Sequence, residues 1–177
     1  MIIVMAISAV LLISCGTLKG QEKSTTKVVE DLFKQAALNE ELELYSEAVK
    51  AYSKIIKIEP ENAMAYDKRG IDYLKMLKYN KALNDMDKAV KLDSSNSEYY
   101  NHRGIVFYCM EITDEAIKDY NKALVLNPSF SKAYFNRGIV WLYLEKEQDG
   151  LADIRIAANL NNKEALDYLN NNTYAFN

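Results

Sequence analysis

The 177-residue chain has an apolar fraction of 49%, a charged fraction of 27% and a formal net charge of −3 at pH 7. This apolar fraction is enough for one domain with a buried core, and two prolines and six glycines favour long helices over many short strands. The sequence contains no dense run of Lys and Arg, which excludes the basic surface that a nucleic-acid-binding protein needs to neutralise phosphates. With two cysteines and one histidine, it predicts no disulfide framework, no metal site and no cofactor.

Residues 1–14 form an uncharged, almost wholly apolar run. The run is too short to span a hydrocarbon core of about 30 Å, which takes roughly 20 helical residues, and it suits the apolar region of a secretory signal. The sequence Leu-Ile-Ser-Cys-Gly at 12–16 resembles the bacterial lipobox, in which cleavage precedes a cysteine that is then acylated. The resemblance implies a lipoprotein with a signal peptide at 1–14 and a lipidated Cys15, whose acyl chains, palmitate among them, hold it on a membrane. The alternative is a buried apolar N-terminal segment with an incidental cysteine.

Residues 15–28 are polar and lack apolar periodicity, so they are expected to form a flexible tether. Gly16 follows the cysteine where some Gram-negative lipoproteins have the aspartate that retains them in the inner membrane. The resemblance therefore implies a location in the bacterial cell envelope and favours the outer membrane if the cell has one.

Beyond residue 28 the sequence repeats with a period of 34 residues. An Arg-Gly pair recurs at 69–70, 103–104 and 137–138. One aromatic residue stands three positions before each arginine, and another stands three positions after each glycine. Farther along each period, alanines and prolines keep the same step: Ala82, Ala89, Ala116, Ala123, Ala157, Pro60 and Pro128.

This pattern of aromatic, small and proline positions resembles the tetratricopeptide repeat. The resemblance implies an all-α fold, a solenoid of four helix-turn-helix hairpins at 29–62, 63–96, 97–130 and 131–164. Residues 165–177 are expected to hold a C-terminal capping helix and a loosely ordered tail. One hairpin cannot bury its apolar stripe alone, so the stacked hairpins are expected to share a continuous core.

Gly70, Gly104 and Gly138 interrupt predicted helices, where glycine costs about 0.5–1 kcal/mol relative to alanine. We therefore expect them at places where two helices approach too closely for a side chain. Gly150 stands where the family has alanine, so alanine is expected to fit there without loss of stability. The glycine that the family usually has in the turn between two helices is absent here, which predicts strained or reshaped turns. The residues at these turn positions are Glu43, Leu77, Glu111 and Glu145.

Each of the three Arg-Gly arginines is matched by an aspartate sixteen positions later, and the pairs are Arg69 with Asp85, Arg103 with Asp119 and Arg137 with Asp153. The first unit lacks both partners, because Gln35 and Ala51 stand at these positions. Their joint loss indicates that the two side chains meet. We expect a series of structural ion pairs along the stack, in which the aspartate belongs to the same unit or to a neighbouring one.

The resemblance also implies a concave groove, lined by recurring positions of the first helix of each unit. In this sequence those positions hold Met64, Asp67, Ile71, Leu74, Asn101, Ile105, Tyr108, Phe135, Ile139, Leu142 and Tyr143. The groove is apolar and aromatic, which suits a hydrophobic segment of a partner. The basic and amide residues with which some family members clamp a C-terminal carboxylate are absent. Cys109 lies on the same face and is expected to be an inert, partly buried thiol.

The sequence leaves no length for a catalytic domain, so we expect no enzyme and no small-molecule substrate. We expect instead a membrane-tethered scaffold or adaptor that binds a protein partner in the groove. The alternative is a structural subunit of a cell-envelope assembly or secretion complex.

Overall fold

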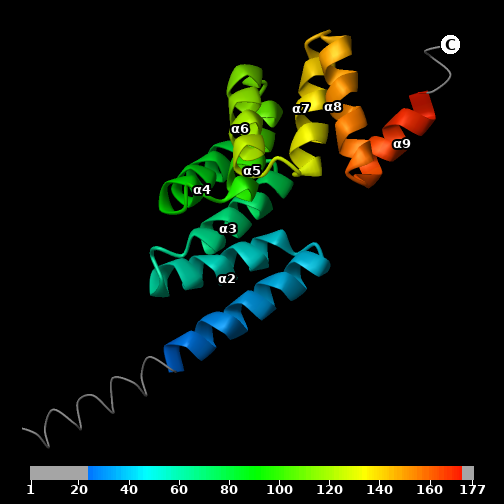
Figure 1. Ribbon diagram of the computed structural model, residues 1–177. Helices are drawn as coiled ribbons and strands as arrows, with labels where there is room; N and C mark the ends of the chain where they lie inside the picture. Colours follow the sequence, from blue (N-terminus) through cyan, green and yellow to red (C-terminus); the bar gives the residue numbers. More distant parts are fainter. Residues whose placement is uncertain (1–23, 173–177) are drawn as a thin grey trace, which may run out of the picture. The chain divides into compact units, whose positions relative to one another are not determined.

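The computed structural model describes residues 24–172, all of whose regular elements are helices (Figure 1). The expected signal peptide, Cys15, the start of the tether and the C-terminal tail at 173–177 lie outside the described residues. The chain divides into two compact parts, Met1–Pro60 and Glu61–Asn177. Each part is described by itself below.

The N-terminal part contains one helical hairpin, made of a helix at 24–41 and α2 (Tyr45–Ile58). The rings of Phe33 and Tyr52 meet edge to face with centroids 5.9 Å apart, and the Tyr52 hydroxyl donates to Glu40 Oε1 at 2.7 Å. The first helix begins earlier than the sequence predicted, so residues 24–28 of the expected tether are helical. Val29, one turn into the helix, is only 6% exposed, and this burial stabilises the extra turn.

The C-terminal part contains three hairpins and a final helix. The hairpins are α3 (Ala63–Lys75) with α4 (Tyr79–Leu92), α5 (Ser97–Cys109) with α6 (Thr113–Leu126), and α7 (Ser131–Tyr143) with α8 (Glu147–Asn159). Their first helices begin 34 residues apart, as the sequence repeat predicts. Each hairpin contacts the next one along the chain, and α9 (Lys163–Asn172) packs against α8 (Figure 1). The expected capping helix is therefore present.

Asparagine side chains start two of the first helices. The Asn62 and Asn96 side chains accept hydrogen bonds at 2.9 Å from the amides of Ala65 and Glu98, satisfying donors that have no partner inside the helix. Asn162 caps α9 in the same way, accepting from the Ala165 amide at 2.8 Å. These caps fix where α3, α5 and α9 begin. The start of α9 follows that of α7 by 32 residues instead of 34.

The four turns without glycine adopt the strained conformation that the sequence predicted. The φ angles are 57° at Glu43, 57° at Leu77, 61° at Glu111 and 59° at Glu145, all in the left-handed region. An L-residue there loses roughly 1–2 kcal/mol because its Cβ crowds the following carbonyl. The turns persist because they satisfy carbonyls at the helix end: the Glu111 amide donates to Tyr108 O and the next amide to Phe107 O, both at 2.9 Å.

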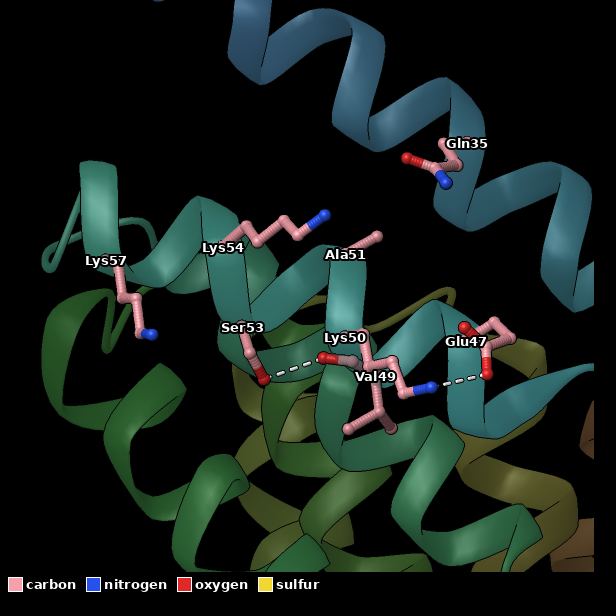
Figure 2. Close-up of a pocket in the computed structure, with 8 residues that line it drawn as sticks. All are labelled: Gln35, Glu47, Val49, Lys50, Ala51, Ser53, Lys54 and Lys57. Atoms are coloured by element: carbon pink, nitrogen blue, oxygen red, sulfur yellow. Dashed lines mark hydrogen bonds and ion pairs between the residues drawn. The ribbon is translucent and has the colours of Figure 1, made fainter.

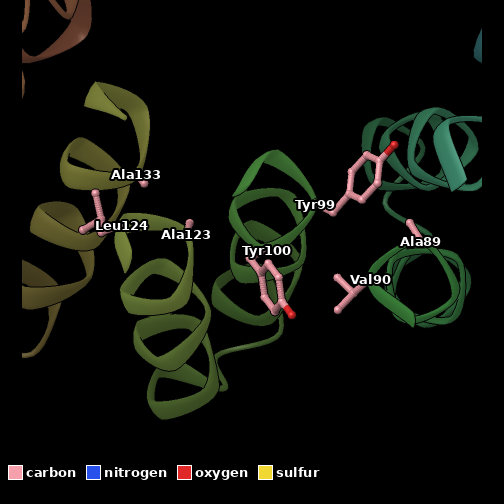
Figure 3. Close-up of a cluster of buried hydrophobic side chains, with 7 residues drawn as sticks. All are labelled: Ala89, Val90, Tyr99, Tyr100, Ala123, Leu124 and Ala133. Carbon is pink, nitrogen blue, oxygen red and sulfur yellow. The ribbon is translucent and has the colours of Figure 1, made fainter. Parts of the chain in front are cut away.

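Alanines and tyrosines alternate in the core between hairpins. Figure 3 shows one such cluster, with Tyr99 and Tyr100 on α5 and small or branched residues on the adjacent helices. Ala89, Ala123 and Ala133 in this cluster are fully buried. Their small side chains leave room for the rings, so neighbouring helices pack at short range.

The expected close approach at the helical glycines is confirmed. A Cβ on Gly104 would lie 2.7 Å from Tyr120 Cε1, and one on Gly138 would lie 2.9 Å from the Gly150 carbonyl oxygen. The expectation that alanine fits at Gly150 is wrong. Its Cβ would lie 2.7 Å from Leu142 Cδ2 and 2.9 Å from the Gly138 carbonyl oxygen, because α7 and α8 cross where both helices carry glycine.

Within residues 24–172, no helix combines the length and the apolar character needed to cross a membrane.

Candidate partner-binding surface

All three expected Arg–Asp pairs form, and each lies within one repeat unit. Arg103 Nε donates to Asp119 Oδ2 at 2.7 Å, and its Nη2 donates to Oδ1 at 2.8 Å. The two side chains are only 20% and 8% exposed, so the pair is bidentate and largely shielded from water. The same two bonds, at 2.7 or 2.8 Å, join Arg69 to Asp85 and Arg137 to Asp153.

The third guanidinium nitrogen links one unit to the preceding one, which the sequence did not indicate. Arg103 Nη1 donates to Asp87 Oδ1 at 2.9 Å, and Arg137 Nη1 donates to Asn121 Oδ1 at 2.5 Å. The hydrogen bonds that Arg103 donates to Asp119 raise the pKa of Arg103 further above its usual value, so its charge is permanent. Each of these two arginines therefore fixes both the angle of its own hairpin and the position of its neighbour.

The recurring aromatic residues pack around these arginines. The Arg103 guanidinium lies 5.6 Å from the centre of the Tyr100 ring and 5.8 Å from that of Phe107. Tyr100 and Tyr120 are 9% and 1% exposed, and burial raises the pKa of the Tyr120 hydroxyl. These aromatics thus stabilise the stack through packing and cation–π contact.

The apolar residues expected in the groove lie on α3, α5 and α7, and we call them together the first-helix surface. Its members are Met64, Ile71, Leu74, Ile105, Tyr108, Phe135, Ile139, Leu142 and Tyr143. Met64 and Tyr143 are 53% and 56% exposed, and the other seven are half-buried. The Tyr108 and Tyr143 rings meet edge to face at 5.9 Å, which joins α5 to α7. Solvent therefore reaches apolar and aromatic side chains on all three helices, while Phe135, Ile139 and Leu142 also pack against buried residues of α8 and α9.

The two polar residues expected in the groove are instead buried and hydrogen-bonded to the next first helix. Asp67 and Asn101 are only 3% and 2% exposed, so they do not offer an open contact to a partner. Asp67 Oδ1 lies 2.8 Å from His102 Nδ1, and Asn101 Oδ1 accepts from Asn136 Nδ2 at 2.9 Å. These polar pairs link α3 to α5 and α5 to α7.

Cys109 differs from the expected partly buried residue, because it is exposed at the end of α5. Desolvation of its sulfur nevertheless raises the pKa of the thiol, which lowers the thiolate fraction at neutral pH. This agrees with the expected inert thiol. Among residues 24–172, no three His, Cys, Asp or Glu side chains are grouped closely enough to hold a metal ion.

The family model of the tetratricopeptide repeat matches residues 97–130, the unit of α5 and α6. MamA of Desulfovibrio magneticus RS-1 has a similar structure, with a TM-score of 0.68 and 22% identity over 75% of each chain. The pilF protein of Pseudomonas aeruginosa gives a TM-score of 0.71 and 20% identity, over 78% of this chain and 63% of that one. The first repeat domain of Spaghetti (RPAP3), bound to the HSP90 peptide SRMEEVD, gives a TM-score of 0.64 and 25% identity, over 67% of this chain and 94% of that one.

No curated protein matches the sequence. The sequence period, the matched unit and the fold agree with one another, and this fold is that of protein-interaction scaffolds. Residues 97–130 are a tetratricopeptide repeat, and the chain has the fold of a tetratricopeptide-repeat solenoid.

Proposed function

We propose that this protein is a membrane-tethered adaptor that holds an apolar segment of a partner protein on the first-helix surface. The observation that carries the proposal is the run of accessible apolar and aromatic side chains over α3, α5 and α7. Contiguous exposed apolar surface is uncommon on monomers and usually marks a partner site. The proposal assigns the chain no catalytic role.

The chemistry of this surface favours an apolar segment over an acidic chain terminus. Phe135 stands at a position where family members that clamp a carboxylate carry basic or amide residues. Asp67 and Asn101, at the corresponding positions of α3 and α5, are buried and hydrogen-bonded to the next helix. The rings of Tyr108 and Tyr143 then provide the anchors, because tyrosine buries a large area at low entropic cost. The HSP90 peptide of the Spaghetti structure supports peptide binding as a use of this fold.

A double variant, Tyr108→Ala with Tyr143→Ala, tests the surface. Proteins that co-purify with the parent from membranes should be lost from the double variant, while its thermal melt changes little. Val125→Ala on α6 is the matched control, because Val125 is a 74% exposed apolar residue outside the first-helix surface. Equal capture by both variants would refute the proposed surface. Capture of a stoichiometric complex rather than an exchangeable client would identify the chain as an assembly subunit.

The tether rests on the Leu-Ile-Ser-Cys-Gly sequence at 12–16. We place the protein in the bacterial cell envelope, anchored by acyl chains on Cys15. Mass spectrometry of the protein extracted from its membrane should show a mature chain that begins with acylated Cys15. An intact Met1 together with a free Cys15 thiol would exclude this anchor.

A further inference from the structure

The helix at 24–41 carries two leucines that solvent reaches. Leu38 is 56% exposed and Leu42 is 60% exposed. The Leu42 amide donates to the Leu38 carbonyl oxygen at 3.1 Å, so the helical turn continues to Leu42 and places the two side chains one turn apart on the same face. Val29 and Ala36 are buried, and Leu38 lies about 200° around the helix from Ala36. We call the exposed face, with Lys34, Leu38, Glu41 and Leu42, the N-terminal face.

The position of Leu38 is buried in later units. Val106 and Val140 occupy it there, and both are fully buried. Val106 packs with Met86 of α4, and Val140 packs with Tyr120 of α6, so each valine is covered by the second helix of the preceding unit. In the part of the chain that the structure describes, no second helix precedes the helix at 24–41. The first hairpin therefore exposes leucine at a position that serves contact between units, although the outer face of a terminal repeat is usually polar.

The last hairpin does not expose its corresponding side. Ala165 of α9 is fully buried and packs with Ala157 and Ala158 of α8, so α9 takes the place of a following unit. A second copy of the chain therefore cannot stack its first hairpin on α8. Such head-to-tail contacts would also lead to open filaments, whereas an isologous contact closes a dimer. The arrangement that remains for two copies brings one N-terminal face against the same face of the other copy.

The charges on the N-terminal face suit an isologous contact. Lys34 lies four residues before Leu38 and Glu41 lies three residues after it, on the same edge of the helix. These positions are about 6 Å before and about 4.5 Å after Leu38 along the helix axis. When two copies pack antiparallel with Leu38 at the twofold axis, Lys34 of each copy lies opposite Glu41 of the other. Within one chain, Lys34 has an exposed ion pair of 3.9 Å with Asp31, which is too weak to prevent this exchange.

The α2 side of the hairpin does not suit contact between two copies. Figure 2 shows Lys54 extending into the space between α2 and the helix that carries Gln35, while Lys57 points away from that helix. Glu47 is the one acidic residue that the figure labels, and its Oε1 accepts from Lys50 Nζ at 2.6 Å. Two copies that met through α2 would bring the charges of Lys54 and Lys57 together, and like charges at an interface oppose binding.

We propose that the N-terminal face is a homodimer interface, in which the helices at 24–41 of two copies pack antiparallel across Leu38. Each copy covers the Leu38 and Leu42 side chains of the other, and Lys34 of each copy pairs with Glu41 of the other. One helix and its turn make a small interface, so we expect a dissociation constant on the order of micromolar. This inference is independent of the adaptor role of the first-helix surface.

Sedimentation velocity of the whole chain over a range of concentrations tests the dimer. The protein is kept reduced in detergent, with micelles in large excess so that two copies do not share one micelle. We expect a monomer–dimer equilibrium whose dissociation constant rises about tenfold or more in the Leu38→Glu, Leu42→Glu variant. The matched control is Val125→Glu on α6, which places a charge on a 74% exposed apolar position and should change the constant less than twofold.

A charge exchange tests whether the occupant is a second copy. Lys34→Glu and Glu41→Lys should each weaken the dimer, and the double variant should restore it, because each pair then has its signs reversed. A protein that stays monomeric at about 100 times the expected dissociation constant would overturn the proposal. If that monomer also lost thermal stability in the Leu38→Glu, Leu42→Glu variant, the face would belong to a contact within the chain. A dimer that the leucine variant leaves unchanged, or that the double charge variant fails to restore, would overturn the proposal as well.

Discussion

Gly104 and Gly70 occupy the same position in consecutive units but have different neighbours, so they allow a matched test of the close packing. A Cβ on Gly104 would lie 2.7, 3.0 and 3.1 Å from three carbons of the Tyr120 ring. Normal carbon contacts are about 3.5–4.0 Å, so the ring would have to move by roughly 1 Å. Tyr120 is 1% exposed and packs with Ala116 and Val140, which are fully buried. The ring therefore has little room to move.

The expected magnitude follows from two opposed terms. Overpacking of a well-packed core costs about 1–3 kcal/mol, and replacing a helical glycine by alanine returns roughly 0.5–1 kcal/mol. Gly104→Ala should therefore lower the free energy of unfolding by about 1–2 kcal/mol, or the Tm by roughly 2–8 °C for a chain of this size. At Gly70 the nearest atom is the terminal methyl of Met86, at 2.9 Å, which can rotate away. Gly70→Ala should therefore stay within about 0.5 kcal/mol of the parent.

Urea and thermal unfolding followed by circular dichroism measure both variants against the parent. Repeat proteins can lose one unit at a time, so the two variants should be compared by their transition midpoints as well as by extrapolated free energies. Equal losses at Gly104 and Gly70, or a Gly104→Ala protein as stable as the parent, would refute the argument that the Tyr120 ring sets the cost.

Three further outcomes follow from the same structure. Arg103→Ala should lower the free energy of unfolding in urea by about 3–5 kcal/mol, because it leaves the buried Asp119 carboxylate unpaired. Lys50→Ala breaks an exposed pair and should lower it by less than about 1 kcal/mol. Similar losses in the two variants would contradict the burial argument. Glu111→Gly should raise the free energy of unfolding by roughly 0.5–1 kcal/mol because it removes the left-handed strain at φ 61°, and a lower stability would show that the turn needs its side chain. Cys15→Ala should move the protein from the membrane fraction to the soluble fraction with an unchanged thermal melt; retention on the membrane would mean that the anchor lies elsewhere.

Features that recur in the sequence could be predicted, because the same packing and pairing requirements recur at the same positions of three successive units. The 34-residue period gave the boundaries of the hairpins, the glycines at helix crossings and the pairing of Arg103 with Asp119. The paired loss at Gln35 and Ala51 supplied the evidence that the two positions meet. The left-handed turn residues followed from the absence of the expected glycine.

Features that depend on the distance between neighbouring helices could not be predicted. Asp67 was expected in the groove, but its Oδ1 lies 2.8 Å from Nδ1 of His102, a residue of the next unit. Nothing in the sequence around Asp67 indicates this contact. Gly150 was expected to accept alanine, yet α8 meets α7 too closely for a Cβ.

A photo-crosslinking amino acid placed at position 108 tests the central claim most directly. Introduced in place of Tyr108 on the first-helix surface, and separately in place of Val125 on α6, it reports which surface contacts a partner in living cells. Val125 is 74% exposed and Tyr108 is half-buried, so accessibility alone would favour a product from position 125. The adaptor account predicts a discrete crosslinked product from position 108 and none from position 125. A product from position 125 alone would contradict the claim that the first-helix surface holds the partner.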